Sequence, residues 1–218
     1  MFKIVDQPEV QQYIDGVGRK ILSVMGPQPF EYKFYVVQDS QLNAFAVPGG
    51  SIYIHTGIIE NARTTDEVAS VVSHEIIHVK GRHIARMSGL DMTSLIGMIG
   101  GLASVAGGGA GAAGIMGKAF AAQRQLEFTR QIEQEADTLG VKYMTEAGYD
   151  PRGSLSFFQT LARERAFNPV NAPPYLLTHP LTGDRIASVE IAIRSLNLRS
   201  VSSSRPDPLV RVQAILRL

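Results

Sequence analysis

Apolar residues recur every three or four positions along much of the chain, a spacing typical of amphipathic helices. The segment 8–25 is an example, because its apolar residues share one face and Gly26 with Pro27 ends the pattern. The same criteria predict further helices over residues 64–87, 118–147, 151–167, 183–198 and, as a short terminal helix, within 208–218. A mainly helical protein is therefore expected.

Three short segments instead combine β-branched and aromatic residues and predict strands, over residues 30–37, 44–47 and 51–55. Pro48-Gly49-Gly50 joins the last two as a turn. One helix, a few strands and then a run of helices indicate an α+β fold, not a doubly wound sheet. We expect a single domain over residues 1–200, and a linker with a short helix over 201–218.

Composition narrows the classes of function. The chain is 44% hydrophobic and 19% charged with a formal net charge of +1, so it can bury a core but lacks the basic stripe of a nucleic-acid-binding protein. It has no cysteine, which excludes disulfides and thiolate metal sites and weakly favours an oxidising, extracytoplasmic compartment. The first ten residues do not resemble a signal peptide, so we expect either a cytoplasmic protein or one whose leader was removed.

Residues 95–117 stand apart, because none of these 23 residues is charged and nine are glycine. The length matches a membrane span, but the glycines make a stable helix in water unfavourable. A flap over a functional site, a hairpin that touches a membrane or outer-membrane proteins, and a tightly packed Gly/Ala helix all remain open.

The chemistry is concentrated in His74-Glu75-Ile76-Ile77-His78, an HExxH motif on a predicted helix. At about 100° per residue the two histidines lie roughly 40° apart, so both imidazoles can reach one ion. Zinc accepts such nitrogen ligands and in catalytic sites keeps one position for a water, whose pKa it lowers to about 7. Glu75 projects near that position and can take the proton of the water and return it to the leaving amine.

Surface histidines that occur by chance are the alternative, but the residues around the motif are Val and Ile. They predict a buried helix, in which two histidines and a glutamate are costly without partners. A zinc site is therefore the favoured interpretation.

The third ligand is not a histidine of this helix. One large class of enzymes has a third histidine ten residues after the first, but here that position is Ile84 and His83 falls one residue early. On a continuous helix His83 lies about 180° from His74, which predicts a surface group or a group behind the ligands.

A carboxylate on the helix predicted over 118–147 is the better candidate. Glu133 and Asp137 are four residues apart and share a face, whereas Glu135 points about 160° away from both. We predict that Glu133 binds the metal and that Asp137 accepts the spare ring N–H of a ligating histidine. Ala136 suits close helix packing; a solvated acidic face is the alternative.

Further segments lie in order around these motifs. They are Asn43-Ala44-Phe45-Ala46-Val47-Pro48-Gly49-Gly50, Arg130-Gln131-Ile132-Glu133, and His179-Pro180 with Arg185. With HExxH and the segment from Glu133 to Asp137, they resemble over about residues 40–190 the zinc metallopeptidases of peptidase family M48, which includes HtpX, the CAAX prenyl protease of yeast and the mitochondrial protease OMA. Thr129 stands where serine is commoner in this family.

The resemblance implies a zincin-like (gluzincin) fold with a small mixed β-sheet beside the active-site helix, and one Zn²⁺ per chain. Without clear flanking membrane helices, the chain is most similar to the soluble, periplasmic BepA-like branch. A bacterial periplasmic or envelope location is therefore expected, and a cytoplasmic one is the alternative.

The resemblance also implies roles for residues around the centre. The strand with Asn43, Ala44 and Phe45 would border the cleft and bind an extended polypeptide. There we expect Asn43 and Ala44 to face the cleft and Phe45 to pack in the core.

His179 would either occupy the fourth zinc position as a latch or donate a hydrogen bond to the oxyanion, with a structural loop histidine as the alternative. Arg185 would orient the region of Asp137, stabilise the oxyanion or form an ordinary surface ion pair, and Tyr175 is a weaker candidate.

The leading hypothesis is a zinc-dependent metalloendopeptidase that hydrolyses unfolded or misassembled envelope proteins. A chaperone-like envelope assembly factor with a latent zinc site is the main alternative. A zinc hydrolase with another substrate is a weaker one.

Overall fold

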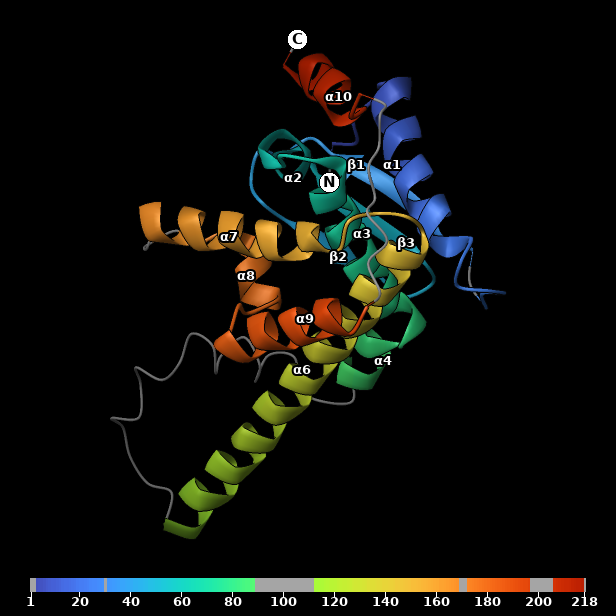
Figure 1. Cartoon of the computed structure of the whole chain (residues 1–218). Coiled ribbons are helices and arrows are strands. Elements are labelled where there is room, and N and C mark those ends of the chain that lie inside the picture. Colours follow the sequence, from blue (N-terminus) through green and yellow to red (C-terminus); the bar gives the residue numbers. More distant parts are fainter. Residues whose placement is uncertain (1–2, 30, 89–111, 169–171, 197–205, 218) are drawn as a thin grey trace.

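The computed structural model describes residues 3–29, 31–88, 112–168, 172–196 and 206–217 (Figure 1). Its helices are α1 (Pro8–Leu22), α2 (Thr56–Asn61), α3 (Thr65–Lys80), α4 (His83–Ser88), α6 (Ala112–Glu146), α7 (Arg152–Phe167), α8 (Pro174–Thr178), α9 (Gly183–Ser195) and α10 (Leu209–Leu216). Its strands are β1 (Lys33–Val37), β2 (Ala44–Ala46) and β3 (Ser51–His55). The predicted α+β fold, mainly helical with a small sheet, is confirmed.

The sheet is mixed and has the order β1-β3-β2, with β1 parallel and β2 antiparallel to β3. The turn between β2 and β3 holds Gly49 and Gly50 at φ 98° and 102°, which only glycine adopts without strain. Alternate residues on one face of the sheet, among them Val36, Ile52 and Ile54, are buried in the main core. One face of the sheet is therefore buried against the helices.

Helix α3 is the centre of the fold, and every residue from Glu67 to Val79 is buried. Its N-cap is Thr64, whose side chain accepts a hydrogen bond from the N–H of Glu67, which is one half of a capping box. The other half is not formed, because the Glu67 carboxylate accepts from the backbone N–H of Arg63 and not from that of Thr64. The helix packs against α1, α6, α7 and the sheet, so any polar group on it must find partners inside the protein (Figure 1).

The single helix predicted over residues 64–87 is wrong in one respect, because it is two helices. Helix α3 ends at Lys80, and Arg82 adopts a left-handed conformation with φ 51° before α4 begins at His83. This left-handed residue reverses the direction of the chain. His83 therefore does not lie about 180° from His74, the angle expected on a continuous helix.

Other boundaries also differ from the prediction. Helix α8 lies between two predicted helices and was not itself predicted; it has a proline in its first turn, where no N–H is needed. Helix α6 begins at Ala112, earlier than predicted, and residues 95–111 of the uncharged segment lie outside the described residues.

The C-terminal helix α10 packs on α1 and α2. Leu209 and Val212 are buried, and Gln213 Nε2 donates to the carbonyl oxygens of Ile59 at 2.9 Å and Ala62 at 2.8 Å. Helix α10 therefore joins the same core as α1. Within the part of the chain that the structure describes, no helix has the length and apolar character to cross a membrane.

Alanine at Gly16 and at Gly18, both in α1, should have opposite effects on stability. A Cβ at Gly18 would lie 2.2 Å from the Phe34 ring, whereas a Cβ at Gly16 meets nothing within 4 Å. We expect Gly16→Ala to raise the free energy of unfolding by roughly 0.5–1 kcal/mol through helix propensity. Gly18→Ala should lower it by about 1–3 kcal/mol through overpacking. Urea unfolding measures both changes, and equal stabilisation by both would contradict the close packing of α1 on β1.

Candidate metal centre

The HExxH motif lies in the second half of α3. His74, Glu75 and His78 are 4%, 1% and 5% exposed. The two imidazoles lie on one face with ring centroids 4.6 Å apart, as their spacing predicts. Buried ionisable groups of this kind require partners, which here come from α6 and from the segment after α8.

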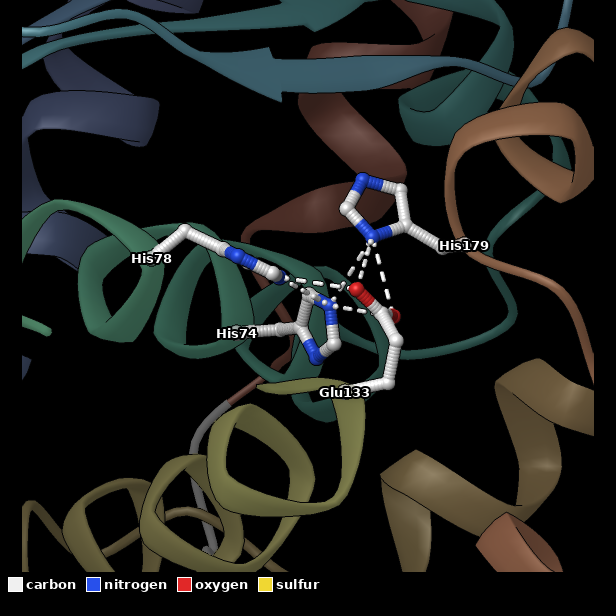
Figure 2. Close-up of side chains that lie close together, drawn as sticks. All are labelled: His74, His78, Glu133 and His179. Carbon is white, nitrogen blue, oxygen red and sulfur yellow. Dashed lines mark hydrogen bonds and ion pairs between the residues drawn. The ribbon is translucent and has the colours of Figure 1, made fainter. Parts of the chain in front are cut away.

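Four potential ligands converge at this point: His74 and His78 of α3, Glu133 of α6 and His179 after α8. Each offers one ligand atom, and these atoms all lie within 4.8 Å of one another. Figure 2 shows the four side chains pointing toward one another from three separate segments. Sequence reasoning predicted the first three as ligands and left His179 with two functional alternatives.

The distances between the donor atoms are short and similar. The Nε2 atoms of His74 and His78 lie 2.9 Å apart, and Glu133 places a carboxylate oxygen 3.4 Å from each of them. His179 Nδ1 lies 3.2 Å from His74 Nε2 and 3.0 Å from Glu133 Oε2. A tetrahedral zinc site with bonds of about 2.0–2.1 Å separates its ligand atoms by about 3.3 Å. The donor set and its spacing therefore fit zinc.

His74 is held with Nε2 directed at the other donors. Its Nδ1 lies 3.0 Å from Asp137 Oδ1, so the ring donates its Nδ1–H to that carboxylate. Asp137 in turn receives two hydrogen bonds from Arg185, at 2.7 Å from Nε and 2.8 Å from Nη2. The spare nitrogen of His74 is therefore occupied, as predicted for Asp137, and Nε2 is left to bind an ion.

Arg185 connects the carboxylates with the segment of His179. It is 3% exposed, and Nη1 lies 3.1 Å both from Glu133 Oε2 and from the carbonyl oxygen of Pro180. The alternative of an ordinary surface ion pair is therefore wrong. Its guanidinium contacts the two carboxylates and a backbone carbonyl and lies 5.3 Å from the centre of the Phe158 ring, an arrangement that suits a group that orients the region of Asp137.

Burial and the neighbouring charges shift the pKa values of the ligands in different directions. Burial disfavours the cation of His74, yet the hydrogen bonds to Asp137 and Glu133 outweigh it and raise its pKa to about 10. Burial and the neighbouring His74 charge hold the pKa of His78 well below its usual value. Burial would raise the pKa of Glu133, but the charge and hydrogen bond of His179 lower it well below the usual range. The same field that favours a proton on His74 favours a metal cation at this point.

Burial would also raise the pKa of Asp137, but the hydrogen bonds and charge of Arg185 outweigh it and lower that pKa. Asp137 therefore remains ionised and able to accept the ring N–H of His74.

Glu75 lies beside the four donors without joining them. Its Oε1 lies 3.5 Å from His179 Nε2 and receives no hydrogen bond from any described residue. A buried carboxylate oxygen without a donor costs about 1–3 kcal/mol, and such atoms are a mark of functional sites. The position of Glu75 therefore suits a group that accepts a proton during a reaction.

The centre lies beneath the surface of the protein. All four potential ligands are buried, and His179 is 7% exposed. A separate cavity of about 20 Å³, enough for one water, adjoins His74, Asp137 and Tyr175 on the side away from the other three donors, none of which lines it.

Two further residues of the sequence analysis lie against the ligands. His83 is fully buried behind His78, with the two Nδ1 atoms 3.1 Å apart, and is not a surface group. Of the two alternatives that the sequence left open for His83, this is the group behind the ligands, and its contact with His78 depends on the turn at Arg82. The ring of Tyr175 lies 4.6 Å from that of His179, and burial raises its pKa well above the usual value.

The strand expected to border the cleft starts next to the centre, because the N–H of Tyr175 donates to the carbonyl oxygen of Leu42 at 3.2 Å. The expected directions of Ala44 and Phe45 are wrong, whereas Asn43, which is half-buried, keeps the expected direction as a prediction. Ala44 is fully buried in the core, whereas Phe45 is half-buried on the opposite face and stacks on Tyr53. The cause is the register with β3, which places Ala44 opposite the core residue Ile54.

Comparison with known proteins places this arrangement in a family. A model of peptidase family M48 matches residues 6–193. The beta-barrel assembly-enhancing protease of Yersinia pestis is 32% identical over 211 residues, which are 93% of this chain and 43% of that protein. The protease of the same name in Escherichia coli (strain K12) is 29% identical over 218 residues, 97% of this chain and 45% of that protein.

A mitochondrial relative is similar as well. The metalloendopeptidase OMA1 of Schizosaccharomyces pombe is 28% identical over 179 residues, 82% of this chain and 51% of that protein. The chain thus spans about half the length, or less, of these curated relatives. The family match includes α3, α6 and His179, and so all four potential ligands. The family expected from the ordered motifs is confirmed, and the chain belongs to peptidase family M48, a family of metallopeptidases.

Proposed function

We propose that the chain is the catalytic domain of a zinc metalloendopeptidase that cleaves polypeptide in extended form. The observation that carries the proposal is the buried set of four donors, His74, His78, Glu133 and His179, with the unpaired oxygen of Glu75 beside it. A donor set of imidazoles and one carboxylate is what catalytic zinc sites use. Membership of family M48 supports the same function.

In this mechanism His74, His78 and Glu133 hold one zinc ion, which when bound supplies a Lewis acid that polarises the peptide carbonyl and acidifies water. Glu75 accepts a proton from the attacking water and returns it to the amine as the C–N bond breaks. Asp137 fixes the ring of His74 through its Nδ1–H.

We place the substrate along β2, which lies at the edge of the sheet formed by the described strands. The carbonyl of Asn43 and the N–H of Val47 bond to β3. In the alternating antiparallel pattern the N–H and C=O groups of Ala44 and Ala46 therefore point away from β3. An extended peptide can pair with these groups and be recognised mainly through its backbone. Asn43 and Phe45 flank this position.

His179 acts as a latch in this proposal. Its Nδ1 completes the four donors and its Nε2 faces Glu75, so the ring occupies the space that water and carbonyl need. The residue lies between α8 and α9, where its backbone N–H donates to the carbonyl of Tyr175. The alternative is a hydrogen-bond donor to the oxyanion. The two roles predict opposite effects on peptidase activity when the His179 ring is removed.

Arg185 is a positioning residue. It binds Asp137 with two nitrogens and also contacts Glu133 and the carbonyl of Pro180. One guanidinium thus holds the carboxylates of Glu133 and Asp137 and the backbone of Pro180, the residue after His179. Bidentate geometry of this kind requires arginine and is lost with lysine.

The relatives named beta-barrel assembly-enhancing proteases support a physiological role in the envelope. We propose unfolded or misassembled envelope proteins as substrates and the periplasm as the location. A chaperone-like assembly factor with a latent zinc site is the second candidate, which the burial of all four potential ligands favours.

Glu75→Gln should retain about one zinc per chain and lose peptidase activity, because the amide keeps the shape of the side chain but cannot accept the proton. The expected loss in casein cleavage is about 10²–10⁴-fold. Glu133→Ala is the matched comparison and should lose both zinc and cleavage. Elemental analysis and casein hydrolysis give the two readouts. Cleavage that survives Glu75→Gln would show that the mechanism is wrong.

His179→Ala should raise casein cleavage, because the donor that closes the fourth position is removed. If the open state makes up about a tenth of the protein, the gain is about tenfold. Leu177→Ala, an exposed neighbour on α8, controls for disturbance of the segment and should have little effect. A loss of activity in His179→Ala would support the oxyanion role instead. No cleavage by either protein would support the chaperone-like candidate.

Arg185→Met should destabilise the metal-free protein, because it leaves two buried carboxylates without their cation. Breaking such a buried pair lowers the free energy of unfolding by about 3–5 kcal/mol. Zinc should offset part of the loss, since its charge compensates Glu133. Arg152→Met, at a fully exposed guanidinium, is the control and should hardly change the unfolding midpoint. Equal stabilities of the two variants would contradict the role of Arg185.

A further inference from the structure

His83 is a buried histidine that contacts a metal ligand without belonging to the ligand set. Its exposed fraction is 0%, and its Nδ1 lies 3.1 Å from Nδ1 of His78 with the two rings nearly perpendicular. On its far side, Nε2 lies 3.5 Å from Glu135 Oε2, too long for a strong hydrogen bond but close enough for attraction. Arg86 Nη1 lies 3.5 Å from the same carboxylate oxygen.

The contact between two Nδ1 atoms requires one donor and one acceptor. If His83 donated, His78 would carry its ring proton on Nε2, where it could not bind an ion. If His78 donates, its Nε2 is free to ligate, and His83 carries its own proton on Nε2, on the side of Glu135. Only the second arrangement is compatible with His78 as a ligand, and it also gives the His83 N–H an anionic neighbour.

We propose that His83 is a positioning residue for the metal centre, which accepts the Nδ1–H of His78 and so fixes the ring and the tautomer in which His78 binds zinc. The inference rests on the proposed function, because it takes His78 as a ligand. Glu135, two residues after Glu133 on α6, attracts the opposite side of the His83 ring. The acceptor behind His78 is thus a neutral imidazole, whereas His74 has a carboxylate, Asp137.

The backbone before His83 supports this role independently. Gly81 has φ −73°, which any residue adopts, yet a Cβ there would lie 2.2 Å from His83 Nε2. The absent side chain therefore makes room for the ring. Arg82 adopts φ 51°, a conformation that costs a non-glycine residue about 1 kcal/mol. This turn brings His83 back beneath His78, which a continuous helix would not do.

The test compares His83→Phe with His83→Asn in the full chain, by competition for zinc with a chromogenic chelator. Phenylalanine fills the space but has no acceptor, so the zinc dissociation constant should rise by about 10–100-fold. Asparagine offers its amide oxygen near the position of Nδ1 and should restore most of the affinity. Unchanged affinity in His83→Phe, or equal losses in both variants, would overturn the proposal.

Gly81→Ala provides a second variant that alters no polar group. In the otherwise unchanged protein it should weaken zinc binding, because the added Cβ displaces the His83 ring. In the His83→Phe background it should cause no further loss of zinc affinity. Additive losses would contradict the proposed link between Gly81 and His83. Circular dichroism of the metal-free proteins reports folding, and if His83→Phe does not fold, His83→Asn and Gly81→Ala decide the question.

The readout also separates this inference from the proposed function. A full chain that binds no zinc at all would overturn both. If the unchanged chain binds zinc and cleaves casein, but His83→Phe binds zinc with the same affinity, the proposed function stands. Only the proposed role of His83 is then wrong.

Discussion

Close packing of α3 on α6 is the constraint on which the metal centre depends. Ala136 of α6 is fully buried, and at Gly140, one turn further, a Cβ would lie 3.2 Å from Ser73 Oγ and 3.4 Å from the backbone N of His74. Small residues at these two positions let the helix backbones approach closely. The approach brings Glu133 within 3.4 Å of the Nε2 atoms of both histidines. A larger residue on this stripe would separate the carboxylate from the imidazoles without touching either.

Once the helices are this close, electrostatics determines how the remaining groups are arranged. Burying Glu133 and Asp137 in a low-dielectric interior is costly unless cations compensate them. Arg185 supplies one cation from α9, and the point between the four donors is suited to another. The metal centre and its arginine are therefore parts of one charge-balanced cluster. That cluster ties α3, α6 and α9 together in addition to their apolar contacts.

The sequence predicted those parts of the centre that depend on helical periodicity alone. Spacing placed His74 with His78 and Glu133 with Asp137, and the structure puts each pair on a common face. For His83 the same reasoning left a surface group and a group behind the ligands open, because its position depends on one left-handed residue, Arg82, that no propensity indicates. The faces of Ala44 and Phe45 were misassigned for a similar reason. The side chains of a strand alternate between its two faces, but the sequence does not show which face meets the core. For β2 that is decided by its pairing with β3, a contact between separate segments.

The short helix α8 links the segment before the edge strand β2 to His179, the proposed latch. The N–H of Tyr175, in α8, donates to the carbonyl of Leu42 just before β2, and the carbonyl of Tyr175 accepts from the N–H of His179. Its ring also contacts that of His179 and lies within 6.3 Å of His74. Tyr175 thus has one backbone bond to the segment that leads into β2 and one to His179. A displacement of the backbone at His179 would either break its bond to Tyr175 or move Tyr175 relative to the beginning of β2, whereas a rotation of the His179 side chain alone leaves both bonds intact. The route by which the proposed latch opens therefore decides whether the edge strand moves with it.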